Sequence, residues 1–124
     1  DELSALIEQL IEERGIEADL NDINTSKITD MSWLFDSSKF NGDISKWNVS
    51  SVENMENMFC SSIFNGDISE WDVSNVENMA HMFNYNFGFN GDLSKWDVSN
   101  AIDNMDNMFD YCALQNNPPA WYKK

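Results

Sequence analysis

The feature that most constrains this chain is a short text that returns at an almost constant interval. Phe-Asn-Gly-Asp-Ile-Ser begins at Phe40, returns 24 residues later at Phe64, and returns again at Phe89 with Leu in place of Ile. A period in this range is typical of proteins in which each repeat forms one coil that stacks on the next. The repetition therefore predicts a solenoid, and it says much less about activity.

The repeat extends further toward the N-terminus than the Phe-Asn-Gly text does. Shifting residues 43–59 back by one period matches every apolar column, with Ile16 in the position of Phe40 and Ile23 in that of Trp47. The first repeat is degenerate in its polar residues, as terminal repeats often are. We therefore expect one domain with four coils, which lie near residues 16–39, 40–63, 64–88 and 89–116.

The first half of each coil has the pattern of a short strand. Polar, apolar and polar residues alternate in Asp43-Ile44-Ser45, and the same triplet recurs at residues 67–69 and 92–94. Alternation places Ile44 inward with Asp43 and Ser45 outward, and identical strands one coil apart would pair in parallel. The Asn-Gly pair before each triplet predicts a tight turn, because glycine adopts positive φ freely.

The second half of each coil has the pattern of a short helix. Ser50 with Glu53, and Ser74 with Glu77, fit the capping box in which Ser is the N-cap and Glu stands at N3. In the fourth coil the same role moves to Asn100, with Asp103 at N3. The apolar residues behind each cap recur at i, i+3, i+6 and i+7, which places them on one helical face. These are Val52, Met55, Met58 and Phe59, with Val76, Met79, Met82 and Phe83 one period later.

The two ends of the chain depart from the repeat and are expected to cap it. Residues 1–15 carry an apolar stripe at helical spacing, Asp1 lies at the positive end of the helix dipole, and Gly15 is placed to end the helix. Residues 117–124 contain Pro118 and Pro119, which cannot donate to a further strand. We expect Trp121 and Tyr122 to fold over the last coil.

The repeat consensus resembles a known family. Phe-Asn-Gly-Asp-Ile-Ser-x-Trp-Asp-Val-Ser-x-Val-x-x-Met-x-x-Met-Phe is similar to the repeat of BspA-type surface proteins, which is also found in mycoplasma lipoproteins, over residues 16–110. The resemblance implies an α/β fold: a right-handed, leucine-rich-repeat-like solenoid with a short parallel strand and a short helix in each coil. It also implies roles in adhesion or protein–protein contact and a cell-surface or secreted location. No catalytic residues carry over from the family.

The charge of the chain narrows the class of partner. The formal net charge is −15, with seven Lys and Arg residues against 22 Asp and Glu. Nucleic-acid binding needs a basic stripe that this composition does not supply, and the charge also repels anionic lipid. No apolar run approaches the roughly 20 residues that span a bilayer, so membrane insertion is not expected. The charge serves either solubility or the attraction of a basic protein.

Two columns of residues are candidate sites. Trp47, Trp71 and Trp96 invite carbohydrate stacking, but Ile23 holds the same position, which favours core packing. Stacked aspartates would repel one another unless they are compensated by local hydrogen bonds, a binding partner or calcium; local hydrogen bonding is the favoured alternative. This column comprises Asp19, Asp43, Asp67 and Asp92.

The remaining reactive residues predict no catalytic, cofactor or metal site. His81 is the sole histidine and has no partner at ligand spacing. Cys60 and Cys112 lie two coils apart, which separates their backbones by about 10 Å. A disulfide requires Cα atoms within about 7 Å, so we expect two free thiols.

The leading hypothesis is a non-enzymatic, acidic module for protein–protein recognition or adhesion, with a monomer favoured. Its partner is a protein, basic if the affinity is electrostatic. The alternatives are a structural or spacer domain of a larger surface or virion protein, and an acidic inhibitor of a nucleic-acid-binding protein. The expected interaction face is the outward polar residues of the strands: Asp43, Ser45, Asp67, Ser69, Asp92 and Ser94.

Overall fold

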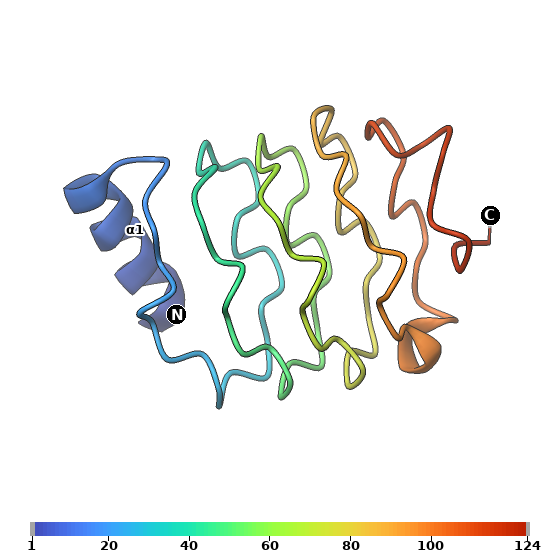
Figure 1. Ribbon diagram of the computed structural model, residues 1–124, viewed down its shortest axis with the longest axis horizontal. Helices are drawn as coiled ribbons and strands as arrows, with labels where there is room; N and C mark the ends of the chain where they lie inside the picture. Colours follow the sequence, from blue (N-terminus) through green and yellow to red (C-terminus); the bar gives the residue numbers. More distant parts are fainter. Residues whose placement is uncertain (1, 124) are drawn as a thin grey trace.

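The computed structural model describes residues 2–123 and shows one helix followed by a row of turn-rich segments. Helix α1 spans Glu2–Arg14, and a single 3-10 turn, η1, spans Ser99–Ala101. The repeat segments follow α1 side by side along the long axis, from blue to red in Figure 1. We call residues 16–39, 40–63, 64–88 and 89–116 the first to fourth layers.

The predicted α/β solenoid is wrong. Within residues 2–123 there is no β-sheet, and the parallel pairing consists of the isolated bridges Asp19↔Asp43, Asp30↔Asn54 and Asn54↔Asn78. The expected helices at residues 52–59 and 76–83 are absent from this part of the chain, so Ser50 and Ser74 are not helix N-caps. The layers are therefore not the strand-plus-helix coils of a leucine-rich-repeat-like fold; they are built almost entirely from turns.

A ribbon of consecutive turns replaces each expected helix. In the first layer, the Leu34 N–H donates to the Met31 carbonyl over 3.3 Å, and the same i→i+3 bond recurs two residues later from Asp36 to Trp33. The N–H groups of the intervening residues point to the next layer instead, as when Met31 donates to Asn54 over 2.9 Å. A helix would consume these N–H groups within one segment. The turn ribbon divides them between the layer and its neighbour.

The turn ribbon requires left-handed backbone at residues that are not glycine. Each layer contains two such residues four positions apart, with φ between 56° and 63°. They are Trp33, Ser37, Asn57, Ser61, His81, Tyr85, Asn107 and Tyr111. Each costs about 1–2 kcal/mol. The cost is offset because each ribbon buries large side chains, such as the fully buried Met58 and Phe59, which contribute about 1.5–3 kcal/mol apiece.

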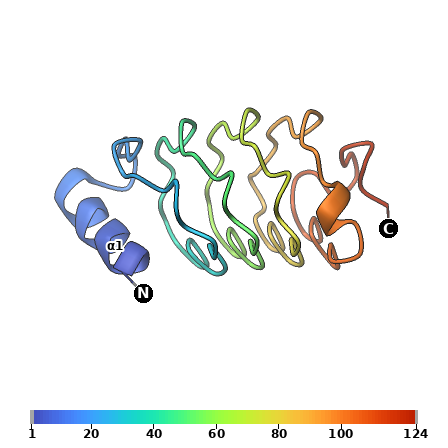
Figure 2. The same cartoon turned by 90° about the horizontal axis from the view of Figure 1, so that it is seen from below.

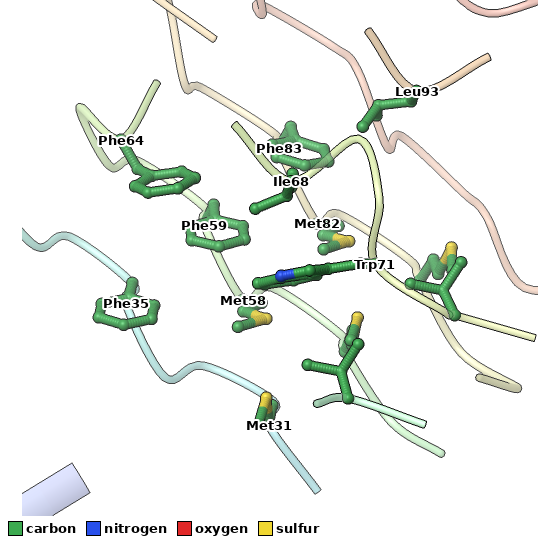
Figure 3. Close-up of a cluster of buried hydrophobic side chains, with 14 of the residues drawn as sticks. Met31, Phe35, Met58, Phe59, Phe64, Ile68, Trp71, Met82, Phe83 and Leu93 are labelled. Carbon is green, nitrogen blue, oxygen red and sulfur yellow. The ribbon is translucent and has the colours of Figure 1, made fainter. Parts of the chain in front are cut away.

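Aromatic side chains stack from layer to layer to form the core. Phe59 lies 5.5 Å from both Phe35 and Phe83, with the rings nearly parallel. Figure 3 shows these three rings in a row, with Trp71 next to Phe59. Phe83 continues the stack onto Phe109 at 5.8 Å. The stacked rings therefore form one continuous hydrophobic core through all four layers.

The prediction that the tryptophan column belongs to the core is confirmed. Trp47, Trp71 and Trp96 are each 4% exposed. Each indole Nε1 donates to a backbone carbonyl of the preceding layer, as Trp71 does to Ile44 over 3.1 Å. Each ring therefore supplies both apolar burial and an interlayer bond, and the indole N–H is not left unpaired in the core.

Two details of the expected repeat are corrected. Ile16 keeps the register of Phe40, since its carbonyl accepts from the Asn41 N–H over 2.7 Å, but its side chain is 47% exposed and is not core. The glycines of the Asn-Gly pairs do not have positive φ. Gly42 is required by close approach instead, because a Cβ there would collide with the carbonyl oxygen of Ala18.

The two ends of the row are covered by different segments. At one end α1 packs its apolar stripe on the core, with Ile7 only 3% exposed, and Gly15 at φ 97° ends the helix as expected. At the other end Trp121 and Tyr122 pack against Phe109. Asp1 and Lys124, which belong to the two predicted caps, lie outside the described residues. Within residues 2–123, no helix has the length and apolarity needed to cross a membrane.

Candidate functional site

The predicted interaction residues form a series of identical turns. The Asp43 Oδ1 accepts from the backbone N–H of Ser45 over 2.9 Å and from its hydroxyl over 2.7 Å. Asp67 holds Ser69 in the same way, at 3.0 and 2.7 Å, and Asp92 accepts from the N–H of Ser94. Local hydrogen bonding, the favoured alternative for this column, is therefore confirmed.

These turns place carboxylates side by side across the layers. We call Asp19, Asp43, Asp67 and Asp92 the aspartate row; a parallel bridge joins Asp19 to Asp43, and all four residues are exposed. The Ser45 hydroxyl and N–H lower the pKa of Asp43, and the Ser69 N–H and hydroxyl lower that of Asp67, although the flanking carboxylates of Asp43 and Asp92 oppose this. Asp43 and Asp67 therefore stay ionised at neutral pH despite the repulsion between neighbouring carboxylates.

A second row of the same turns was missed from the sequence. Asp72 holds Ser74 and Asp97 holds Ser99 through the same pair of bonds, and these serines lower the pKa of both aspartates. The earlier layers use an asparagine for this turn, since Asn48 Oδ1 accepts from the N–H and hydroxyl of Ser50. The sequence did contain a signal for this second row, because Asp-Val-Ser has the same Asp-x-Ser spacing as Asp-Ile-Ser. Its serine, however, was interpreted as a helix N-cap.

A shallow groove crosses the layers beside the second row. It has a volume of about 500 Å³, and its polar lining includes Glu53, Glu77 and Asn75. The Asn75 Nδ2 donates to the Ser50 carbonyl over 2.7 Å, and Asn100 repeats this bond one layer later. The groove walls are therefore fixed by interlayer bonds and carry exposed carboxylates.

An exposed aromatic cluster is a further feature that the sequence did not indicate. Tyr85 and Tyr111 occupy equivalent left-handed positions in successive layers and stack at 4.8 Å with 7° between their rings. Phe87 meets Tyr85 edge-on at 6.3 Å and is 72% exposed. Within the insertion at residues 84–88, Phe87 is exposed while the adjacent Asn86 is fully buried and its Nδ2 donates to the Phe64 carbonyl over 3.0 Å.

The cysteines and the histidine are set apart from these surfaces. The Cys112 thiol is buried against the Phe89 carbonyl, and burial raises its pKa, which keeps the unreactive thiol form. Cys60 is half-buried beside Ser61. His81 is half-buried in a left-handed turn position. No group of three or more His, Cys, Asp or Glu side chains in residues 2–123 is arranged to hold a metal ion.

The chain matches one family over nearly its entire length. The family model described as "Mycoplasma protein of unknown function, DUF285" matches residues 4–121. The chain belongs to this family. No curated protein and no solved structure gives a significant match.

Proposed function

We propose that this member of the DUF285 family is a non-enzymatic recognition module that binds a basic protein through the aspartate row and its serines. The observation that carries the proposal is the repetition of one hydrogen-bonded Asp-x-Ser turn at successive layers. Each turn fixes one carboxylate oxygen while the carboxylate stays exposed to solvent. A partner that meets this surface would not have to order the side chains first, which lowers the entropic cost of binding.

Electrostatics supports the nature of the partner. The net charge of −15 steers cationic proteins toward the molecule and repels nucleic acid and anionic lipid. Asp92 of the row also lies near Lys95, whose Nζ is 3.2 Å from the Glu70 carboxylate at an exposed position. Alternating charge of this kind contributes little to stability, and it favours one orientation of a partner over others.

The BspA-type resemblance of the repeat text supports an adhesive role. Belonging to a mycoplasma family is compatible with display on a cell surface, and we include adhesion and a surface location in the proposal. The layers present their polar turns on the outside of a continuous core, which is the arrangement that stacked-repeat proteins use for binding.

The test replaces aspartate by asparagine, because the chain already contains both residues in the same kind of turn. Asn48 makes the same turn as the aspartates without a charge, so the triple variant Asp43→Asn, Asp67→Asn, Asp92→Asn removes three charges and keeps the turns. Affinity for a synthetic peptide rich in Lys and Arg, measured at low salt, should fall about tenfold, since each exposed charge pair contributes about 0.2–1 kcal/mol. Circular dichroism should be unchanged.

The matched control removes three charges elsewhere. Glu2, Glu8 and Glu12 are exposed on α1 and do not belong to the row. Their replacement by Gln should leave the affinity within about twofold of that of the native chain. Equal losses in the two variants would mean that net charge alone attracts the peptide. No loss in either variant would favour the spacer function, and competition by DNA for the peptide would favour an inhibitor of nucleic-acid-binding proteins.

A further inference from the structure

The backbone N–H groups that join the layers form a regular pattern. In each of the first three layers, four alternate residues of the turn ribbon donate to four alternate carbonyls of the next layer, over 2.8–3.0 Å. In the third layer, Met79 donates to Asn104, His81 to Asp106 and Phe83 to Met108. These bonds of the turn ribbon all run in one direction, from the N–H groups of one layer to the carbonyls of the layer that follows.

The fourth layer has no such successor among the described residues. The equivalent donors are the N–H groups of Met105, Asn107 and Phe109, and no residue in the range 2–123 accepts a hydrogen bond from them. The fourth donor of this set, the Tyr111 N–H, is satisfied by the Gln115 side chain over 3.1 Å. Phe109 is only 1% exposed, and Trp121 and Tyr122 pack against it, so its N–H is covered. We call the two remaining N–H groups, those of Met105 and Asn107, the donor edge. It presents donors only, since the carbonyls of this ribbon already accept from the third layer.

A pocket of about 290 Å³ lies at the donor edge and is acidic. Met105 and Asn107 line it together with Asp103, Asp106 and Asp110. Asp103 and Asp106 are exposed, and Lys123 contributes one cationic side chain. The pocket therefore combines backbone donors, which need acceptors, with carboxylates, which need cations.

This combination selects one class of occupant. An anion would satisfy the N–H groups, but it would be repelled by the three aspartates. A second copy of the chain would have to bring the carbonyls of its first layer, against which α1 is packed, and would carry the same charge of −15 (Figure 2). A basic peptide meets both needs, because its backbone carbonyls accept hydrogen bonds while its Lys and Arg side chains pair with carboxylates.

We propose that the donor edge binds an extended or turn-forming segment of a basic protein, which adds to the fourth layer through backbone hydrogen bonds. Recognition of this kind draws affinity from main-chain bonds and specificity from side chains. The proposal shares the basic partner of the proposed function but places a separate anchor at the end of the molecule. The two proposals can therefore fail independently.

The test uses a peptide that reproduces an interlayer contact in this chain. Residues 51–62 supply the carbonyls that serve the first layer, so the probe is this segment with Glu53 and Glu56 replaced by Lys and Cys60 by Ser. In the free protein, the amides of Met105 and Asn107 should exchange with solvent at least about a hundredfold faster than those of Met79 and His81. Saturating peptide should slow the exchange of the first two amides at least about tenfold and leave the other two unchanged.

Two variants separate this site from the aspartate row. The Asp103→Lys, Asp106→Lys variant should weaken peptide binding at least about tenfold, while the Asp43→Asn, Asp67→Asn, Asp92→Asn variant should leave the amide protection intact. A scrambled peptide of the same composition should not protect the donor edge. Equal protection by the scrambled peptide, donor-edge amides already protected in the free monomer, or protection that appears only as the protein dimerises would each overturn the proposal.

Discussion

At the N-terminal end of the row, an amphipathic helix covers the first layer mainly with apolar side chains, and Arg14 at its end donates to the Asp19 carbonyl and the Asp22 carboxylate. Ile7 is buried there and Leu10 packs beside it, while the backbone of α1 satisfies itself internally. At the C-terminal end, Trp121 instead imitates the next layer: its Nε1 donates to the Leu93 carbonyl over 2.8 Å, and its ring lies 6.4 Å from Trp96. The first end is closed by apolar contact, and the second is partly closed by a continuation of the repeat.

The comparison shows how differently a stack of layers can be terminated. The helix hides apolar surface without extending the bonds of the turn ribbon, whereas a single tryptophan continues the tryptophan column and leaves the donor edge open. Apolar burial is proportional to area and indifferent to direction, while hydrogen bonds depend on register and geometry. Four experiments test this difference, beginning with the largest expected effect.

Truncation of the buried contact at the helical end should be the most damaging change. Ile7→Ala should lower the free energy of unfolding by about 2–4 kcal/mol, because it opens a cavity between α1 and the first layer. Leu6→Ala is the matched control; this neighbouring side chain is 39% exposed and should cost less than about 1 kcal/mol. Urea denaturation measures both, and equal losses would mean that α1 does not cover the core.

Removal of the tryptophan at the opposite end should cost less, because its ring is only half-buried. Trp121→Ala should lower the free energy of unfolding by about 2 kcal/mol, through lost stacking on Trp96 and a lost bond to Leu93. Trp121→Phe keeps a ring without the donor and should cost about 1 kcal/mol. If both variants lost the same amount, the indole N–H alone would account for the contribution of Trp121.

A substitution at the junction between α1 and the first layer should lower the free energy of unfolding by a smaller amount. Gly15→Ala should cost about 1 kcal/mol in thermal or chemical unfolding, because the backbone at this residue has φ 97°. Gly88 provides the control, since its φ is not positive and a Cβ there would meet nothing within 4 Å. Gly88→Ala should therefore be neutral or slightly stabilising. A neutral Gly15→Ala would show that the helix can end without the left-handed residue.

Acidification should destabilise the third and fourth layers more than the first two. This is the smallest of the four expected effects. The serine turns lower the folded pKa of Asp72 and Asp97, whereas Asn24 and Asn48 hold the equivalent turns without titrating. The folded state therefore binds fewer protons than the unfolded state. The contribution of these aspartates is complete above an ordinary Asp pKa of about 3.9 and is lost as the pH falls below it.

Amide exchange at successive pH values measures this difference. Protection in the third and fourth layers should decline first as the pH falls from 5 toward about 3. The Asp72→Asn, Asp97→Asn variant keeps the turns and should remove part of the difference between the layers. Uniform loss of protection in the native chain would contradict the role assigned to the turns.

The apolar columns could be predicted from the sequence because burial requires only periodicity. Trp71 and Phe59 fall in repeated positions, and both are core, while Asp43 satisfies its own turn as expected. The local structure of Met55-Glu56-Asn57-Met58-Phe59 could not be predicted in the same way. Its spacing places Met55, Met58 and Phe59 on one side in a helix and also in a turn ribbon, so the pattern does not distinguish the two.

The donor edge and the aromatic cluster lay beyond sequence reasoning for a related reason. Left-handed backbone at Tyr85 and Tyr111 carries no glycine signal, and it is this conformation that brings the two rings together. Likewise, Pro118 and Pro119 predicted the end of the repeat, whereas Trp121 keeps its place in the tryptophan column.

The sequence by itself determined that this protein is a set of similar segments with a common core, a helical end and a strongly acidic surface. Only the tertiary structure decided that the segments are layers of turns, where the polar turns line up, and which backbone donors stay open. The physical reason is that an apolar side chain needs only the correct side of the chain. A backbone N–H needs a particular acceptor, and here most of the deciding acceptors lie one layer away.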